Sequence, residues 1–254
     1  MRSRDFASSR EHANSMRNDL TIYDSVADHW WSDDVRWIRT LKNMVPGRLN
    51  WFDRHVDWTD ARVLDLGCAG GFMAEAMHDR GATVTGIDPA TNAIDIARAH
   101  AEAHGRDISY DVGVGEDLPY ESAAFDFVVC VDVLEHVQCL SSVLNEVSRV
   151  LRGGGMFLFD TINSTRLARL LAVAVAENVV GLLPRGTHDP DLFIRPRDLR
   201  AELQKVGLNP GDFTGLGPRW LDRRGDFTFG QLPFMGLIYM GVAQKKNERT
   251  KYDV

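Results

Sequence analysis

The chain has 254 residues, of which 44% are hydrophobic and 26% are charged, and its net charge is −7. This length and composition are typical of a globular protein with its own core, and they exclude collagen-like, intrinsically disordered and disulfide-scaffold proteins. The negative charge, without any long run of basic residues, argues against a nucleic-acid partner. Three cysteines without CxxC spacing, Cys68, Cys130 and Cys139, indicate reduced thiols and a cytoplasmic protein.

The chain divides into segments of different composition. Residues 1–18 are charged and lack the apolar stretch of a secretory signal, so we expect a disordered leader. Residues 19–60 hold five of the six tryptophans among charged residues, which predicts an N-terminal helical cap. We expect the main domain at 61–245, with a lid inserted at about 165–208, and a solvated tail at 246–254.

Short runs of β-branched and aromatic residues alternate with segments of helical composition in the main domain. The predicted strands are RVLDLG, TVTGID, ISYDVG, FDFVVCVD and MFLFDT, and FMGLIYMGVAQK near the end of the chain has the same composition. Strands that alternate with helices form a parallel sheet with crossover helices. The sequence therefore predicts an α/β fold, doubly wound around a mostly parallel sheet.

A glycine-rich turn at residues 67–71 follows the first predicted strand. Glycine in such a turn lets a ligand lie against bare backbone at the carboxyl end of the sheet. A dinucleotide fingerprint that begins at Gly67 needs two more glycines, where this chain has Ala69 and Phe72, and this disfavours a nicotinamide oxidoreductase. Asp88 ends the next strand about 20 residues further on, which is the separation that places a carboxylate on ribose hydroxyls.

Four motifs occur in order along the chain: DLGCAGG, GID, GEDLP and FDFVVCVDVLEHV. Together they resemble the class I S-adenosylmethionine-dependent methyltransferases, whose Rossmann-like fold has a seven-stranded, mostly parallel sheet. The resemblance implies that Gly67 contacts the methionine part of the cofactor and that Asp88 holds its ribose. The other cofactor-binding residues that it implies are Asp65, Glu116, Asp117 and Val131, and Arg48 is added by the resemblance to a narrower family described next.

Five further stretches are similar to the O-methyltransferases of ubiquinone biosynthesis. They are YDSVADHWW at 23–31, PGRL at 46–49, AEN at 176–178, LPRGTHD at 183–189 and FIRP at 193–196, and the match runs from Tyr23 to Lys245. This resemblance implies methyl transfer to a catechol-type hydroxyl on a polyprenylated ring. We expect Trp30 and Trp31 either to cover the cofactor or a quinol ring, or to pack an N-terminal helix.

The chain departs from that family's pattern in three places. Val45 and Ile238 each stand where the pattern has asparagine, and residues 160–164 read DTINS where it has STLNR. These positions lie where the substrate is expected, so an O-methyltransferase for a soluble phenolic metabolite is the alternative enzyme. A non-catalytic S-adenosylmethionine-binding protein is the alternative from another class.

Methyl transfer from a sulfonium requires the enzyme to position and deprotonate the acceptor hydroxyl. Asp132, Glu135 and His136 have the spacing i, i+3 and i+4, which places them on one face if a helix begins there. Such a trio is suited to a hard divalent ion such as Mg²⁺, and the family's E-x-x-E-H motif, here D-x-x-E-H, implies a metal site. In the alternative without metal, His136 lines the substrate pocket. The predicted catalytic residues are Asp132, His136 and His188.

The apolar stretch Leu167–Leu183 is long enough for an interfacial helix, but its charged and polar residues make it unsuited to spanning a bilayer. We expect it either to attach the protein peripherally to the inner face of a membrane that holds a polyprenylated substrate, or to pack as a lid on the substrate pocket.

Overall fold

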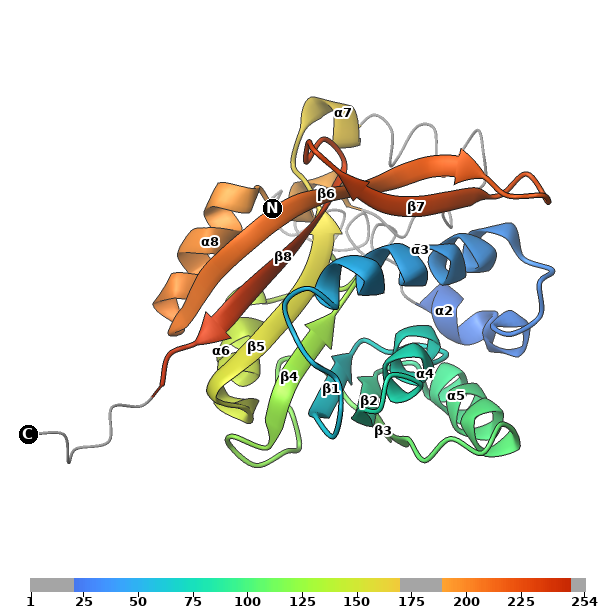
Figure 1. Cartoon of the computed structure of the whole chain (residues 1–254), viewed down its shortest axis with the longest axis horizontal. Helices are drawn as coiled ribbons and strands as arrows, with labels where there is room; N and C mark the ends of the chain where they lie inside the picture. The colour runs from blue at the N-terminus through green and yellow to red at the C-terminus, as the bar shows by residue number, and fades with distance from the viewer. Residues whose placement is uncertain (1–20, 170–188, 248–254) are drawn as a thin grey trace, which may run out of the picture.

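The computed structural model describes residues 21–169 and 189–247 (Figure 1). Their strands form one mixed sheet in the order β3-β2-β1-β4-β5-β8-β6-β7. The parallel strands are β1 (Arg62–Leu66), β2 (Thr83–Asp88), β3 (Ser109–Val112), β4 (Phe125–Cys130) and β5 (Leu151–Ile162). The antiparallel strands are β6 (Leu208–Leu221), β7 (Phe227–Leu232) and β8 (Ile238–Lys245). The predicted α/β fold with a mostly parallel sheet is confirmed.

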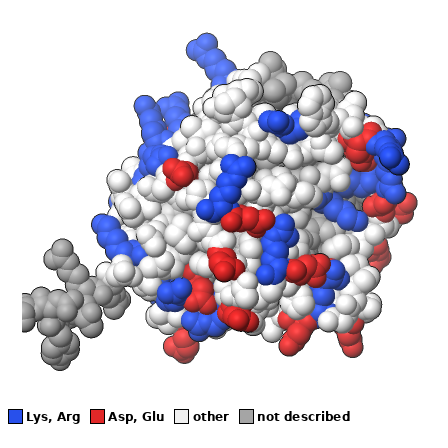
Figure 2. Space-filling view, in the orientation of Figure 1, with Lys and Arg blue, Asp and Glu red and all other residues white. Residues whose placement is uncertain are grey.

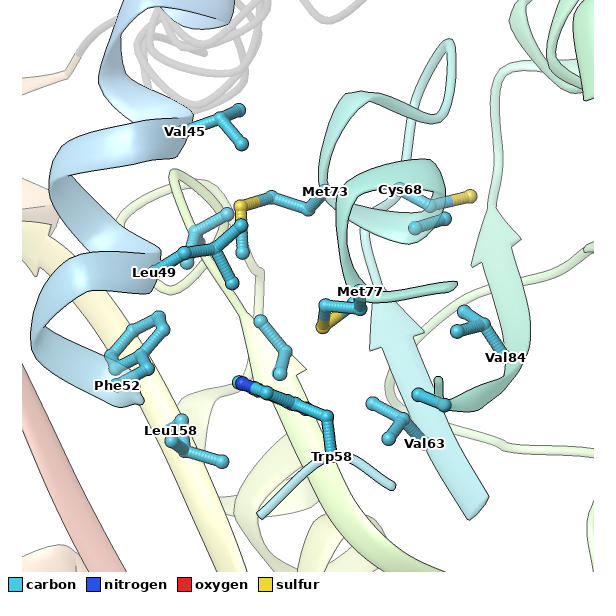
Figure 3. Packing of buried hydrophobic residues seen from close by; sticks show 14 of the residues in the cluster. Val45, Leu49, Phe52, Trp58, Val63, Cys68, Met73, Met77, Val84 and Leu158 are labelled. Carbon is cyan, nitrogen blue, oxygen red and sulfur yellow. The ribbon is translucent and has the colours of Figure 1, made fainter. Parts of the chain in front are cut away.

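Helices cover both faces of this sheet. One apolar core lies under α3 (Arg36–Phe52), α4 (Phe72–His78) and α5 (Thr91–Ala103), and a second lies under α6 (Leu140–Val150) and α8 (Pro196–Lys205). Successive strand residues point to opposite faces, so Val63 belongs to the first core and Leu64 to the second. Figure 3 shows side chains of α3, α4 and the strands converging in the first core. Apolar residues run continuously along the central strands because both faces are covered.

The N-terminal segment, which the tryptophan-rich composition predicted to be a helical cap, precedes β1 in the described chain. It consists of α2 (Thr21–Ser25), the short 3-10 helix η1 (Ala27–His29) and α3. Helix α3 packs closely on β7, because Gly47 has no side chain: a Cβ there would lie 2.6 Å from the carbonyl oxygen of Phe229. This close approach brings the next residue of α3, Arg48, over the sheet.

Two features differ from the sequence-based expectation. The sheet in the described ranges has eight strands where seven were predicted, because β6 runs on beyond β8 and turns at Gly225 (φ +78°) into the edge strand β7. The predicted lid at 165–208 includes α8, but this helix packs on the sheet, with Leu199 and Leu203 fully buried in the second core. The other helices in the described part of this segment are α7 (Arg166–Arg169) and η3 (Pro190–Leu192).

Several predictions fall outside the described residues. These are the leader at 1–18, most of the stretch Leu167–Leu183, and His188. Within the described ranges, none of the helices is long and apolar enough to cross a membrane. The three cysteines are free, with Cys68 and Cys130 buried and Cys139 exposed.

Charge is unevenly distributed over the face shown in Figure 2. Most of the Asp and Glu side chains on this face lie in its lower half, whereas β4 and β5 run towards the upper end of the molecule (Figures 1 and 2).

Candidate cofactor-binding and active site

The glycine turn after β1 has a backbone that only certain residues can adopt. Gly67 and Gly71 have φ values of +79° and +90°, in the left-handed region that favours glycine. A Cβ at Gly71 would lie 2.5 Å from the Tyr110 hydroxyl oxygen. The turn is joined to β2 by hydrogen bonds from the Gly67 and Cys68 N–H groups to the Ile87 carbonyl, of 2.8 and 3.2 Å. The backbone of this turn, which is predicted to contact the cofactor, is thus held in one shape by β2.

Asp88, at the carboxyl end of β2, joins this turn to the start of α5. Its Oδ2 accepts a hydrogen bond of 2.9 Å from the Ala69 N–H, and its Oδ1 accepts one of 2.8 Å from the Ala90 N–H. Burial raises its pKa. Each carboxylate oxygen has two lone pairs, so both oxygens retain acceptor capacity for ribose hydroxyls. Asp88 is therefore suited both to shaping the loop and to holding a ribose.

Asp65, next to the last residue of β1, is a buried carboxylate close to Asp88. Burial, together with the negative charge of Asp88, raises its pKa to about 7, while a backbone hydrogen bond from Ala74 acts in the opposite direction. Its Oδ2 is buried without a hydrogen-bond partner in the part of the chain that the structure describes. An unsatisfied buried acceptor beside a glycine turn fits a ligand that carries a donor, such as the ammonium group of an amino acid.

The other predicted cofactor residues come to the same edge of the sheet. Glu116 and Asp117 lie in the turn that follows β3, and Val131 directly follows β4 and is buried. The turn after β3 lies close to the end of β1: a Cβ on Gly115 would be 3.2 Å from the side chain of Leu66. Carboxyl ends of parallel strands meet at one edge, which explains how residues far apart in sequence come together here.

Arg48 is buried and lies between two carboxylates. Its Nε donates a hydrogen bond of 2.6 Å to Asp160 of β5, and its Nη2 donates to Asp132 in the turn after β4. It is 2% exposed. The attraction of the two carboxylates raises its pKa, against the opposing effect of burial. Arg48 therefore joins α3 to the sheet edge where the glycine turn lies.

The residues after β4 do not form the helix that the metal prediction required. Asp132 has a positive φ of +56°, residues 134–136 form a turn, and α6 begins only at Leu140. The side chains consequently diverge: Asp132 binds Arg48, whereas Glu135 accepts a hydrogen bond of 2.7 Å from the Thr161 hydroxyl. No group of three metal-ligating side chains occurs among residues 21–169 and 189–247. The predicted Mg²⁺ site on Asp132, Glu135 and His136 is therefore not formed.

Two tryptophans of the N-terminal segment cover the glycine turn. Trp30 packs against Gly70, where a Cβ would lie 2.5 Å from the indole Cγ, and Trp31 Nε1 donates a hydrogen bond of 3.0 Å to the Gly70 carbonyl. Trp31 also stacks on His100 of α5, with ring centroids 3.5 Å apart. The tryptophans thus hold the N-terminal segment against the turn. Of the two roles expected for them, the structure supports packing of this segment.

Comparison with known proteins agrees with this geometry. A family model described as "Methyltransferase domain" matches residues 64–159. The ubiquinone biosynthesis O-methyltransferase of Pseudomonas syringae pv. tomato is 40% identical over 205 residues, which cover 80% of this chain and 88% of the relative. The enzyme of the same description from Pseudomonas entomophila is 40% identical over 199 residues, covering 78% of this chain and 85% of that one.

Two solved structures show the same fold. Magnesium protoporphyrin IX methyltransferase from Synechocystis PCC 6803, solved with bound SAH, has a TM-score of 0.60 at 17% identity and covers 82% of this chain and 85% of its own. An S-adenosylmethionine-dependent methyltransferase from Methanosarcina mazei has a TM-score of 0.58 at 20% identity, with coverage of 78% and 98%.

The fold, the glycine turn and the acidic strand ends define a class I S-adenosylmethionine-dependent methyltransferase. With 40% identity over 88% of the length of a curated relative, the chain belongs to the ubiquinone biosynthesis O-methyltransferase family.

Proposed function

We propose that this protein transfers a methyl group from S-adenosylmethionine to a catechol-type hydroxyl of a polyprenylated ring in ubiquinone biosynthesis. The observation that carries the proposal is the 40% identity to ubiquinone biosynthesis O-methyltransferases over most of both chains. The buried acids at the sheet edge support it, because methyl transfer to a phenol needs a group that removes the hydroxyl proton.

The cofactor site in this proposal consists of the glycine turn, Asp65 and Asp88, together with Arg48 and the backbone at Glu116, Asp117 and Val131. When bound, S-adenosylmethionine supplies a sulfonium-activated methyl group, which the acceptor oxygen displaces in line. The protein's task is then to orient the acceptor and to hold its proton. Within the described residues, Asp132 and His136 are the proposed groups for that task, and His188 remains a prediction outside them.

Replacing Asp88 with alanine is expected to weaken S-adenosylhomocysteine binding by about tenfold or more, because two hydrogen bonds from ribose to a charged group are lost. Calorimetry of the purified variant measures the effect. Asp79→Ala is the matched control, since this acid pairs with Arg106 away from the turn, and it should bind like the wild type. An Asp88→Ala protein that is folded and binds with wild-type affinity would contradict the proposed site.

Methyl transfer is expected to withstand chelation, because Asp132, Glu135 and His136 do not converge on one ion. Excess EDTA should leave the rate within about twofold of the untreated enzyme, whereas His136→Ala should lower kcat about 100-fold, the usual effect of removing a general base. The rate is followed by formation of S-adenosylhomocysteine. If EDTA abolishes activity and Mg²⁺ restores it, this prediction is wrong and a metal takes part in the reaction.

The substrate class is tested by mass spectrometry of the products. The purified enzyme is given labelled cofactor with a prenylated catechol and, separately, with soluble catechols that lack the prenyl chain. Methylation of the prenylated acceptor with the higher kcat/KM supports the proposal. Preference for the soluble catechols supports the alternative of a phenolic metabolite, and binding of the cofactor without turnover of any acceptor supports a non-catalytic protein.

Membrane attachment through Leu167–Leu183 and a cytoplasmic location remain predictions. Only the first three residues of that stretch are described, and among them Leu167 is half exposed. A peripheral attachment of this kind would bring the site to a lipid-dissolved acceptor.

A further inference from the structure

The buried acid Asp160 of β5 is not among the predicted cofactor, catalytic or metal residues, yet it contacts two of them. Its Oδ2 accepts the 2.6 Å hydrogen bond from Arg48 Nε, and its Oδ1 accepts one of 2.8 Å from the backbone N–H of Asp132. Arg48 Nη2 in turn donates to the Asp132 carboxylate. The three residues therefore form a closed ring that joins α3, β5 and the turn after β4.

The exposed fractions show which member of the ring faces outward. The side chain of Asp132 is 26% exposed, that of Arg48 2%, and that of Asp160 is completely buried. Asp160 and Arg48 therefore form a rigid base under Asp132, which alone of the three presents a substantial surface at the carboxyl ends of the strands.

The backbone of Asp132 explains why such a base is needed. Its φ of +56° lies in the left-handed region, which residues with a side chain rarely adopt. The bond from its N–H to Asp160 holds the backbone in that state, while the bond to Arg48 fixes the direction of its carboxylate. Only a carboxylate at position 160 accepts from both donors at once: an asparagine has one acceptor oxygen, and its amide nitrogen would face another donor.

We propose that Asp160 is a positioning residue for methyl transfer, which holds Asp132 so that its carboxylate faces the acceptor hydroxyl. The inference rests on the proposed function, in which Asp132 contacts the acceptor.

The test compares Asp160→Asn and Asp160→Ser with the wild type on whichever acceptor the wild type methylates. We expect kcat to fall about tenfold or more, while the affinity for S-adenosylhomocysteine changes less than about threefold, because Asp65, Asp88 and the glycine turn are retained. Phe159→Leu is the matched control, since the neighbouring Phe159 is equally buried but belongs to the second core. It should lower the melting temperature and leave kcat unchanged.

A double-mutant cycle separates positioning from a general effect. In an Asp132→Asn background, adding Asp160→Asn should lower kcat by less than about twofold, because its effect acts through Asp132. The inference is overturned if Asp160→Asn lowers kcat in the Asp132→Asn background as much as it does in the wild type. It is also overturned if Phe159→Leu lowers kcat equally, or if folded Asp160 variants keep the wild-type kcat. If neither Asp160 variant folds, the residue serves folding and the inference is also overturned.

A crystal structure of Asp160→Asn supplies a readout that needs no acceptor. We expect the Asp132 backbone to leave the left-handed region or its carboxylate to turn from Arg48, and an unchanged Asp132 would contradict the inference. If the wild type methylates no acceptor of the proposed class, the proposed function fails, whereas this structure still decides the role of Asp160.

Discussion

Replacing Arg48 with alanine is expected to lower the free energy of unfolding by about 3–5 kcal/mol and to abolish methyl transfer. The arginine is almost completely buried, and its loss leaves the fully buried Asp160 without its cation. A buried charge that loses its partner is among the most destabilising changes known for a single residue. Chemical denaturation measures the loss of stability, and formation of S-adenosylhomocysteine measures the loss of activity.

The matched control is Arg62→Ala, which removes a half-exposed arginine from its pair with Asp126 at the opposite edge of the sheet. Exposed pairs contribute little, so a loss below about 1 kcal/mol is expected there. Combining Arg48→Ala with Asp160→Asn removes the unpaired charge and should recover part of the stability but none of the activity. A loss below about 1 kcal/mol for Arg48→Ala alone would show that the buried pair does not stabilise the fold.

The positions in the fold of the residues predicted to bind the cofactor follow from local rules. The glycines of the turn, together with the acid at the end of β2, follow directly from strand–turn–helix patterning. Gly71 and Asp88 have the backbone and the contacts that such patterning requires. The parallel sheet places the later motifs at the same edge, so their position follows from the predicted topology alone.

The residues after β4 were not predictable in the same way. The spacing of Asp132, Glu135 and His136 suggested a helix face, but a helix requires negative φ values and Asp132 has +56°. Its conformation is set by Asp160 and Arg48, which lie 28 residues after it and 84 residues before it. Tertiary contacts of this kind leave no signal in the residues around Asp132 themselves.

One signal was present and would have identified Asp160. The strand MFLFDT places an acid in an otherwise apolar run of a strand predicted to be covered on both faces. A charge in such a position needs a buried partner. Arg48, in the PGRL motif at 46–49, was a candidate cation for it. The lid boundary had no comparable signal, because α8 has a mostly polar sequence whose few apolar residues pack on the sheet.

Replacing Glu135 with glutamine is expected to stabilise the protein at alkaline pH. Glu135 is buried in the turn after β4, and burial, with a further contribution from the charge of Asp132, raises its pKa to about 8. In the unfolded chain a glutamate has a pKa of about 4.3. Between these values the folded state binds more protons than the unfolded state, so the free energy of unfolding falls as the pH rises.

Glutamine keeps the size and the acceptor oxygen for the Thr161 hydroxyl but never ionises. The variant should match the wild type near pH 4.5, and its advantage should grow with pH to about 2–4 kcal/mol near pH 8 and stay at that level above it. Asp65, whose pKa burial raises to about 7, acts in the same direction but is present in both proteins. Urea denaturation at several pH values therefore isolates the contribution of Glu135.

Glu146→Gln supplies a control of opposite sign. Its hydrogen bond with Arg149 lowers the pKa of Glu146, so its ionised form is favoured in the folded state and stability is lost as the pH falls through the folded pKa. The glutamine variant should accordingly be less stable than the wild type at pH 7 and above. If Glu135→Gln behaves like this control and is the less stable protein at pH 8, then Glu135 is held ionised in the fold, and a proton-accepting role for it beside Asp132 would have to be considered.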